Sequence, residues 1–329
     1  MEKYLRKCLE SLIISDESME KLEVLIINDG SKDSSSQIAH EYESKYPRTF
    51  RVIDKENGNY GSCINRGLKE VIGKYVKILD ADDYFNTDLL EDFLFFTENV
   101  DVDLILSDFV KVDINGTVLS EYNQSQLFGL KSGTILDFPS FCHANPSFYG
   151  YMHSFAYRTD LFNRFSYFQT EGISYTDQEW VFIPVFCVKT FSYLEIPIYN
   201  YLTGREGQTM DTTVLGRSMT QLVLIARRLS VIYTERKKAN CGTYDYFENH
   251  ISTLLTMIYK QGLIQDKSHS LTDVLKEFDT DICCLTDINS LSESISFGRV
   301  KYVKLWRSNN RNQLPLWFLI YVKILNYIK

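Results

Sequence analysis

Three carboxylates crowd into four residues of this chain, at Asp80, Asp82 and Asp83. Carboxylates this close together repel one another unless a cation neutralises them. Their oxygen ligands suit Mg²⁺ or Mn²⁺, which proteins usually hold with one or two carboxylates plus substrate phosphates. The cluster therefore predicts a Mn²⁺ or Mg²⁺ site for a phosphorylated ligand. A solvated acidic turn that caps the following helix is the alternative.

A calcium loop is a second alternative for the same segment. Five side chains fall at the ligand positions of an EF-hand loop: Asp80, Asp82, Asn86, Asp88 and Glu91. The position where that loop requires glycine is Phe85, however, and the residues before Asp80 have the pattern of a strand rather than a helix. The EF-hand interpretation is therefore excluded.

The elements around the cluster indicate an α/β fold. An apolar run at 22–27 is typical of a buried parallel strand and ends in a turn at Asp29, and a second strand at 75–79 leads into Asp80. Helical patterns cover 2–14, 34–46 and 64–72. Alternating strands and helices predict a parallel sheet whose ligands bind beyond the carboxyl ends of the strands, where Asp29 and Asp80 both lie.

The remainder of the chain changes in character. Strands are predicted at 103–112 and 117–122 around Asn115-Gly116, and at 154–158, followed by helices at 177–188, 218–237 and 244–261. The character of the sequence changes between 205 and 217, which suggests a boundary between two domains. We expect a catalytic domain over 1–210 and a helical C-terminal region over 211–329.

The composition excludes several classes. With 44% hydrophobic residues, 6 Pro and 16 Gly, the chain is neither collagenous nor disordered. Its 7 cysteines are scattered and form no disulfide framework, which indicates a reducing, cytoplasmic setting. The N-terminus has no signal-peptide core, and no run reaches the roughly 20 apolar residues that a membrane-spanning helix needs.

The net charge of −8 is unevenly distributed. Residues 299–329 contain seven Lys or Arg and no Asp or Glu, which leaves −15 for the rest of the chain. An acidic body with a basic, aromatic tail suits an anionic lipid surface better than nucleic acid. The apolar stretch 314–328 is too short to span a bilayer, so it predicts an interfacial helix on the inner face of the cell membrane. A helix docked on the protein's own core is the alternative.

The segments 24–33 (VLIINDGSKD) and 74–83 (KYVKILDADD), with 57–61 (NGNYG) and 65–67 (NRG) between them, resemble the family 2 inverting glycosyltransferases. The resemblance covers about 1–210. It implies a GT-A, Rossmann-like, mostly parallel sheet flanked by helices, with a C-terminal helical annex. It also implies transfer of a sugar from a nucleotide-sugar, here a UDP-sugar, to a hydroxyl of a glycan or lipid-linked acceptor in cell-surface polysaccharide synthesis.

The same resemblance assigns roles to residues on the donor side. Asp29 should pair with the uracil ring, although a plain turn residue is the alternative. Asp82 should bind the metal first and Asp80, near the ribose, second, while Asp83 shapes the loop. The predicted nucleotide-sugar site comprises Asp29, Gly30, Ser31, Asn57, Gly61, Asp80 and Arg205. Arg205 lies in the segment 204–209, which resembles one that closes over the diphosphate; a solvated arginine is its alternative.

On the acceptor side, the block 175–180 (YTDQEW) matches the family segment that carries the catalytic base. Asp177 aligns with the base, which removes the proton of the acceptor hydroxyl, and Glu179 is the second choice. Thr176 stands where the family usually has Glu. Asp177 as a helix cap is the alternative, and the two roles are compatible.

One departure from the family matters. Members usually begin with a buried strand, whereas this sequence begins at the helix that follows it. Such a strand would be central in the sheet, so its absence would expose the edges of its neighbours. A start assigned too late and a true truncation remain open, as does a homo-oligomer. The competing function is a truncated, non-catalytic subunit that binds a partner transferase or a membrane. A nucleotidyltransferase is disfavoured, because the first strand lacks a Gly-rich, basic phosphate loop.

Overall fold

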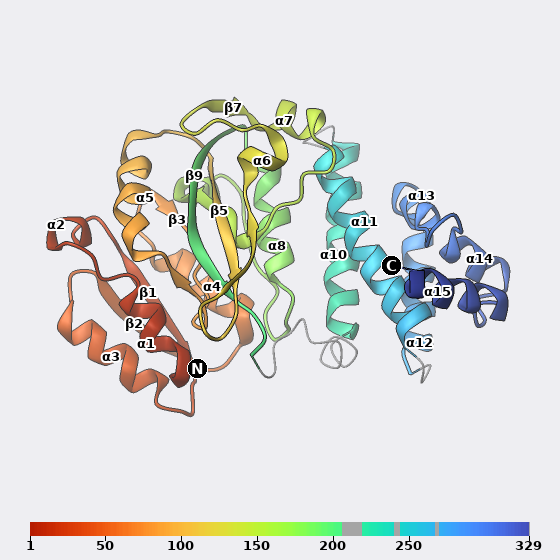
Figure 1. Ribbon diagram of the computed structural model, residues 1–329, viewed down its shortest axis with the longest axis horizontal. Coiled ribbons are helices and arrows are strands. Elements are labelled where there is room, and N and C mark those ends of the chain that lie inside the picture. The colour runs from red at the N-terminus through yellow and green to blue at the C-terminus, as the bar shows by residue number, and fades with distance from the viewer. Residues whose placement is uncertain (206–218, 240–243, 267–269, 329) are drawn as a thin grey trace. The chain divides into compact units, whose positions relative to one another are not determined.

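The computed structural model describes residues 1–205, 219–239, 244–266 and 270–328. The chain divides into two compact units, Met1–Gln208 and Thr209–Lys329 (Figure 1). The boundary expected at 210/211 and residues 206–209 of the predicted diphosphate segment lie outside the described residues.

The N-terminal unit alternates strands and helices through its first hundred residues (Figure 1). Its α-helices are α1 (Glu2–Glu10), α2 (Asp16–Met19), α3 (Ser35–Lys45), α4 (Asn59–Glu70), α5 (Thr87–Asn99), α6 (Gln124–Phe128), α7 (Phe138–Ala144) and α8 (Asp177–Phe182). Its strands are β1 (Val24–Asp29), β2 (Phe50–Lys55), β3 (Tyr75–Val76), β4 (Tyr84–Phe85), β5 (Leu104–Val112), β6 (Val118–Tyr122), β7 (Ile135–Asp137), β8 (Phe155–Arg158) and β9 (Thr190–Leu202).

The strands form two sheets. β1 and β2 make a parallel pair, and a seven-stranded sheet has the order β3-β8-β5-β9-β4, with β6 added to β5 and β7 to β9. Within the larger sheet β5 and β9 pair in parallel, and the other pairs are antiparallel. The α/β class is confirmed, but the pairing is mixed rather than mostly parallel. Short connections such as the Asp113–Gly116 turn, with Gly116 at φ 82°, return the chain antiparallel.

The strand expected at 75–79 is shorter than predicted, because only Tyr75 and Val76 pair with β8. Beyond them the chain is held by side chains: the Lys77 Nζ donates to the His153 carbonyl at 2.5 Å, and the Asp80 N–H donates to the Tyr199 hydroxyl at 3.2 Å. The segment that enters the acidic cluster is therefore positioned by tertiary contacts rather than by a strand ladder.

Strand β1 has an open edge. Among the described strands it pairs only with β2, and all six of its residues are partly exposed although four of them are Val, Leu or Ile. Parallel strands are normally buried on both faces.

The core of the N-terminal unit lies between the helices and the sheets. Helix α1 buries Leu5 and Leu9 at helical spacing, and both join a hydrophobic cluster that includes Phe93 of α5 and Ile105 of β5. Residues 104–106 are completely buried because β5 has neighbours on both sides. The sheet thus gives a rigid base to the loops that follow its strands.

The C-terminal unit is helical, as predicted. It contains α10 (Met219–Lys238), α11 (Tyr244–Lys260), a π-helical turn η4 (Gln261–Gln265), α12 (Thr272–Cys283), α13 (Thr286–Ser294), α14 (Tyr302–Ser308) and α15 (Leu316–Ile328). Its core includes large buried side chains such as Tyr259, Phe278 and Trp306. Within the described residues, no helix combines the length and apolarity needed to cross a membrane.

Candidate active site

Asp29, at the end of strand β1, accepts hydrogen bonds from the last residue of strand β2 and from the loop that follows β2. The Lys55 Nζ lies 2.5 Å from Asp29 Oδ1, the Gly58 N–H donates to the same oxygen at 2.9 Å, and the Asn57 amide donates to Oδ2 at 3.2 Å. Burial raises the pKa of Asp29, but the hydrogen bonds from Lys55 and Gly58 outweigh it, and the net pKa is lowered. Asp29 is thus held as a carboxylate.

The turn after Asp29 is tight. Gly30 has φ 69°, and a Cβ there would lie 3.2 Å from the Asn57 N, so a side chain is disfavoured both by the backbone and by the neighbouring loop. The Ser31 N–H donates to Asn28 Oδ1 at 3.2 Å, and Ser31 is exposed. Gly30 and Asn57 therefore lie beside Asp29, and Ser31 borders them.

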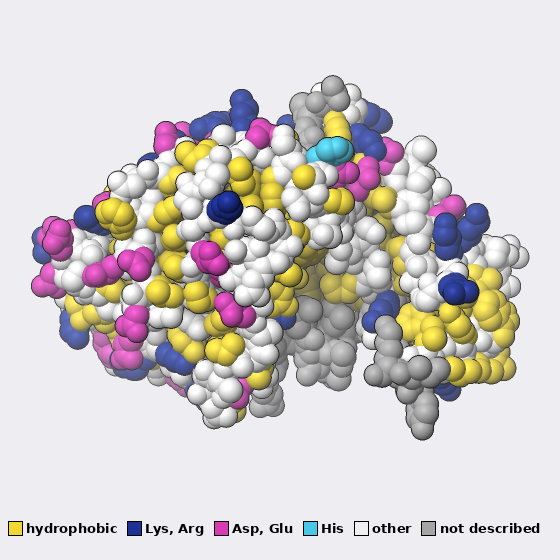
Figure 2. Space-filling model, turned by 45° about the horizontal axis from the view of Figure 1, so that its top comes forward, with side chains coloured by type: hydrophobic (Ala, Val, Ile, Leu, Met, Phe, Trp, Pro, Cys, Tyr) yellow, Lys and Arg dark blue, Asp and Glu magenta, His cyan; other side chains and the backbone are white. Residues whose placement is uncertain are grey.

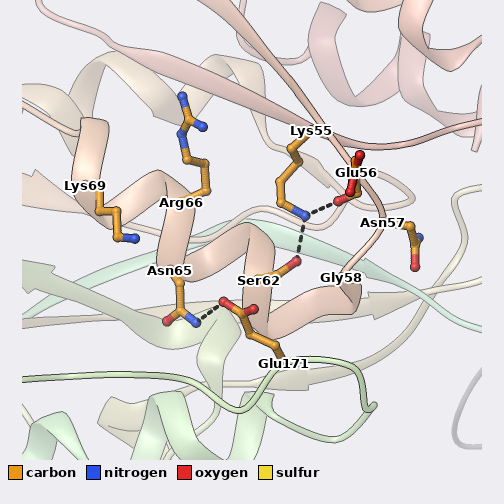
Figure 3. A pocket seen from close by; sticks show the side chains of 9 residues that line it. All are labelled: Lys55, Glu56, Asn57, Gly58, Ser62, Asn65, Arg66, Lys69 and Glu171. Atoms are coloured by element: carbon orange, nitrogen blue, oxygen red, sulfur yellow. Dashed lines mark hydrogen bonds between the residues drawn. The ribbon is translucent and has the colours of Figure 1, made fainter.

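A polar cavity of about 320 Å³ opens beside this turn, at the start of α4 (Figure 3). Its lining residues are Lys55, Glu56, Asn57, Gly58, Ser62, Asn65, Arg66, Lys69 and Glu171. The Lys55 Nζ also donates to Ser62 Oγ at 2.8 Å and to the Glu56 carbonyl at 2.5 Å, as Figure 3 shows. The cavity has three cationic side chains, two carboxylates (Glu56 and Glu171) and several amide and hydroxyl groups, so it suits a polar ligand.

The first turn of α4 joins Asp29 to the acidic cluster Asp80, Asp82 and Asp83. Asn57 and Gly58 bind Asp29 just before the helix, and within the helix the Tyr60 hydroxyl donates to Met152 Sδ at 3.0 Å and lowers the pKa of Asp80, against the larger effect of burial. One helical turn thus interacts with two carboxylates that are 51 positions apart in the sequence.

Gly61 has a packing role on the same helix. A Cβ there would lie 2.0 Å from the Thr170 carbonyl oxygen, so α4 approaches the 169–171 loop closely. Asn65 fixes this contact, because its amide donates to the Gln169 carbonyl at 2.8 Å and its oxygen accepts from the Gln169 N–H at 2.9 Å. Gly61 therefore lies close to Gly58, which binds Asp29, and contacts the loop that leads to Asp177.

The three carboxylates of the acidic cluster have different partners. Asp83 is buried and accepts from the Tyr199 hydroxyl at 2.5 Å and from the Leu202 N–H at 2.8 Å, both on β9. Asp82 is partly exposed and pairs with the Arg205 Nε at 2.5 Å. Asp83 therefore anchors the loop to the sheet, as expected, and Arg205 is an ion-paired residue rather than a solvated one.

Burial makes this cluster electrostatically costly. It raises the pKa of Asp80 well above its ordinary value, the charges of Asp83 and Asp82 raise it further, and the Tyr60 hydrogen bond opposes them only in part. Burial likewise raises the pKa of Asp83 to about 7, against the opposing hydrogen bond from Tyr199. Three carboxylates face one guanidinium, so the cluster favours a further positive charge.

The donor set fits a metal shared with a substrate. Among the described residues, no three His, Cys, Asp or Glu side chains form a complete metal site. Asp83 has both oxygens engaged on β9, which leaves Asp82 and Asp80 as the available carboxylates. Two carboxylates completed by phosphate oxygens and water is a common arrangement for Mg²⁺, and it does not require a third protein ligand.

Asp177 and Glu179 differ sharply although both lie on α8. Glu179 is fully buried, with its two oxygens accepting from the Thr170 N–H at 2.6 Å and the Thr170 hydroxyl at 2.7 Å. Asp177 begins the helix, is partly exposed, and contacts the Gln178 amide at 3.0 Å. Burial raises the pKa of Asp177, and the charge of Asp177 in turn raises the pKa of Asp80.

Several residues of this site were not found from the sequence. Tyr60 lies inside the segment 57–61 that resembles the family, and this resemblance is a signal that could have identified it. Tyr199 holds Asp83 and Asp80 from β9, but in a chain with 22 Tyr it has no distinguishing local pattern. Lys77 is a third case: burial lowers its pKa to about 7 beside the His153 carbonyl. His153 itself stacks on Tyr201 at 4.5 Å, as a structural residue would.

Comparison with solved structures supports the same fold. The crystal structure of Staphylococcus aureus TarS 1-349 in complex with UDP-GlcNAc matches with a TM-score of 0.66 at 19% identity, covering 94% of this chain and 85% of that one. At this identity the likeness concerns the fold alone.

Sequence comparison gives the family. The model for Glycosyl transferase family 2 matches residues 1–165, which is half of the chain. A putative glycosyltransferase, EpsH of Bacillus subtilis, is 30% identical over 211 residues, covering 61% of this chain and 57% of that protein. TarS of Staphylococcus aureus, a poly(ribitol-phosphate) beta-N-acetylglucosaminyltransferase, is 27% identical over 212 residues, 64% of this chain and 35% of TarS. This chain thus spans about half or less of these relatives, and by its family match it belongs to the family 2 glycosyltransferases.

Proposed function

We propose that this chain transfers a sugar from a UDP-sugar to a hydroxyl of a glycan or lipid-linked acceptor, with inversion, in the synthesis of a cell-surface polymer. The observation that carries the proposal is that one helix, α4, joins three parts of the site: Gly58 before it binds Asp29, Tyr60 lowers the pKa of Asp80, and Gly61 packs on the 169–171 loop that leads to Asp177. Relatives that make or modify such polymers, among them TarS, support the substrate class.

On the donor side, Asp29 would accept a hydrogen bond from the uracil N–H at Oδ2, which is contacted by the Asn57 amide at 3.2 Å, whereas Lys55 and Gly58 bind Oδ1. Asp82 and Asp80 would hold Mn²⁺ or Mg²⁺, which neutralises the diphosphate as a leaving group. Arg205 pairs with Asp82 in the structure, and it would transfer its ion pair to a phosphate once Asp82 binds the cation.

On the acceptor side, Asp177 would act as the base. It removes the proton of the acceptor hydroxyl while that oxygen bonds to the anomeric carbon, and the bond from this carbon to the diphosphate oxygen breaks on the opposite face. A raised pKa makes Asp177 a stronger base than an ordinary carboxylate. Glu179 is less suited to this role, because both of its oxygens are bound to Thr170.

Isothermal titration with UDP, in Mn²⁺ and in EDTA, tests the proposal. We expect binding that requires Mn²⁺ and that weakens at least about 10-fold in Asp82→Asn, since a lost ligand lowers metal affinity by that order or more. Asp88→Asn, an exposed carboxylate on α5, is the matched control and should bind like the unmodified chain. Asp177→Asn should bind UDP normally and lose about 10²-fold or more in turnover. Equal binding in EDTA, or none in Mn²⁺, would contradict the proposal.

The open edge of β1 favours a second candidate, a non-catalytic subunit that binds a partner transferase or a membrane. Metal-dependent UDP binding without turnover of any UDP-sugar, and with a gain of activity in a partner transferase, would favour it. The two candidates therefore differ in whether the chain alone turns over a UDP-sugar.

A further inference from the structure

Helix α15 is mostly apolar, with Lys323 as its single charged residue. One side is docked on its own unit: Phe318 and Val322 are buried, and the Phe318 ring stacks on Tyr302 of α14 at 5.9 Å. On this side α15 is therefore docked on the core of its own unit, which was the alternative considered from the sequence. This docking determines which side of the helix is exposed.

The other side of α15 is exposed. Leu316, Ile320 and Ile324 follow one another at intervals of four residues, so they form a stripe along the helix, and Trp317 lies beside it. Their exposed fractions are 73%, 49%, 51% and, for Trp317, 55%. Figure 2 shows hydrophobic side chains gathered on the C-terminal unit with Lys or Arg among them. Large apolar patches of this kind mark interaction surfaces.

Basic residues lie on α15 and in the segment before it. Of the basic residues between 299 and 328, Arg307 and Arg311 are bound to the buried Asp279, at 2.6 Å each. The other four are exposed: Arg299, Lys301, Lys304 and Lys323. The Arg299 N–H contacts the Tyr321 hydroxyl of α15 at 3.4 Å, so the turn that carries Arg299 lies against this helix. The sequence provides no carboxylate between 299 and 329 to balance these charges.

We infer that the exposed face of α15, with Arg299, Lys301, Lys304 and Lys323, binds an anionic lipid surface with the helix parallel to it. The helix has 13 residues, about 20 Å, so it can lie in the headgroup region but cannot cross. Its apolar stripe would enter the acyl boundary while Lys323 extends to the phosphates. A symmetric second copy fits less well, because it would bring the same cations against one another.

This inference is independent of the proposed catalytic function, and vesicle binding by the full chain tests it. Vesicles of phosphatidylcholine with roughly one-third phosphatidylglycerol are compared with phosphatidylcholine alone. The chain has 3 Trp, of which Trp180 and Trp306 are buried and Trp317 is exposed, so a blue shift of the emission reports entry of Trp317. We expect a shift and cosedimentation with the anionic vesicles, and little with the neutral ones.

Variants separate the apolar and the charged contributions. Ile320→Ser with Ile324→Ser should weaken binding about 10-fold or more, and Lys301→Gln with Lys304→Gln about 5-fold per lysine and in a salt-dependent manner. Ile72→Ser with Phe95→Ser, and Lys131→Gln with Lys260→Gln, change equally exposed side chains elsewhere and should bind normally. Trp317→Phe should bind and lose the shift.

Three outcomes would overturn the inference. They are equal binding to neutral and anionic vesicles, binding unaffected by the variants in α15 and α14, and a dimer in sedimentation that dissociates in Ile320→Ser with Ile324→Ser. The last of these would assign the face to a second copy of the chain.

Discussion

Two buried groups of charges, one in each unit, show opposite balances. In the C-terminal unit one carboxylate, Asp279, binds Arg307 and Arg311 and accepts a hydrogen bond from Tyr259; we call this the arginine cluster. In the N-terminal unit the acidic cluster, Asp80, Asp82 and Asp83, has one guanidinium, that of Arg205. The arginine cluster has two guanidiniums around the carboxylate of Asp279, whereas the acidic cluster has one guanidinium for three carboxylates.

The pKa directions follow the same division. Burial raises the pKa of Asp279, but the hydrogen bonds from Arg307, Tyr259 and Arg311 outweigh it, so the net pKa is lowered. In the acidic cluster burial dominates, and the pKa values of Asp80 and Asp83 are raised. A neutralised buried charge serves the fold, whereas an uncompensated one in a site is a candidate for binding a charged ligand. By this criterion the arginine cluster is structural, and the acidic cluster is the candidate for binding a charged ligand.

The largest expected effect is on the arginine cluster. Asp279→Ala leaves two partly buried guanidiniums without their partner, and we expect the free energy of unfolding to fall by about 3–5 kcal/mol. Chemical denaturation measures it, with Asp281→Ala as the control, because Asp281 is an exposed partner of Arg227 and should cost about 1 kcal/mol or less. UDP affinity should not change. Equal stability of the two variants would remove the structural role assigned to Asp279.

A cation added from solution should compensate one cluster and not the other. Arg205→Gln and Arg311→Gln each deprive a carboxylate of a charged partner, and we expect each to lower the free energy of unfolding by about 1–3 kcal/mol. Mn²⁺ with UDP stabilises any chain that binds them, so each variant is compared with the unmodified chain: we expect a larger gain for Arg205→Gln, whose missing charge the cation replaces, and the same gain for Arg311→Gln. Equal gains for both variants, measured by thermal unfolding, would contradict a cation site in the acidic cluster.

The smallest expected effect is a difference in pH dependence. Asp83 has a folded-state pKa of about 7, above its ordinary value, so without metal its contribution to stability is present in acid and is lost as pH rises through about 7. Asp279 has a lowered pKa, so its contribution is present above the ordinary value and is lost as pH falls below it.

Thermal unfolding in EDTA from pH 2 to pH 8 measures both effects, each of the order of a few degrees. Asp83→Asn should reduce the fall in stability toward neutral pH, with the remainder due to Asp80, and Mn²⁺ with UDP should reduce it in the unmodified chain. A stability that rises steadily to pH 8 in EDTA would contradict a raised pKa in the acidic cluster.

The sequence predicted the acidic cluster but not the arginine cluster. The apolar run before Asp29 and the acidic residues after 79 located one cluster, because strand patterns and turn residues are local signals. The arginine cluster was not predicted: Arg307 and Arg311 were counted with the basic tail. Their partner Asp279 lies 28 and 32 residues away, and no local pattern links them.

The sequence by itself determined the order of the elements, the family, and the places of Asp29, Asp80, Asp82 and Asp177 at element ends. Those features follow from periodicity and short motifs, which act over a few residues. Only the tertiary structure decided which partner each carboxylate has. Asp83 is bound by Tyr199, 116 residues away, and Glu179 by Thr170, whereas Asp82 is paired with Arg205 and Asp177 is partly exposed. Hydrogen-bond partners of buried charges are assigned by packing between distant segments, and packing also decided which face of α15 remained exposed.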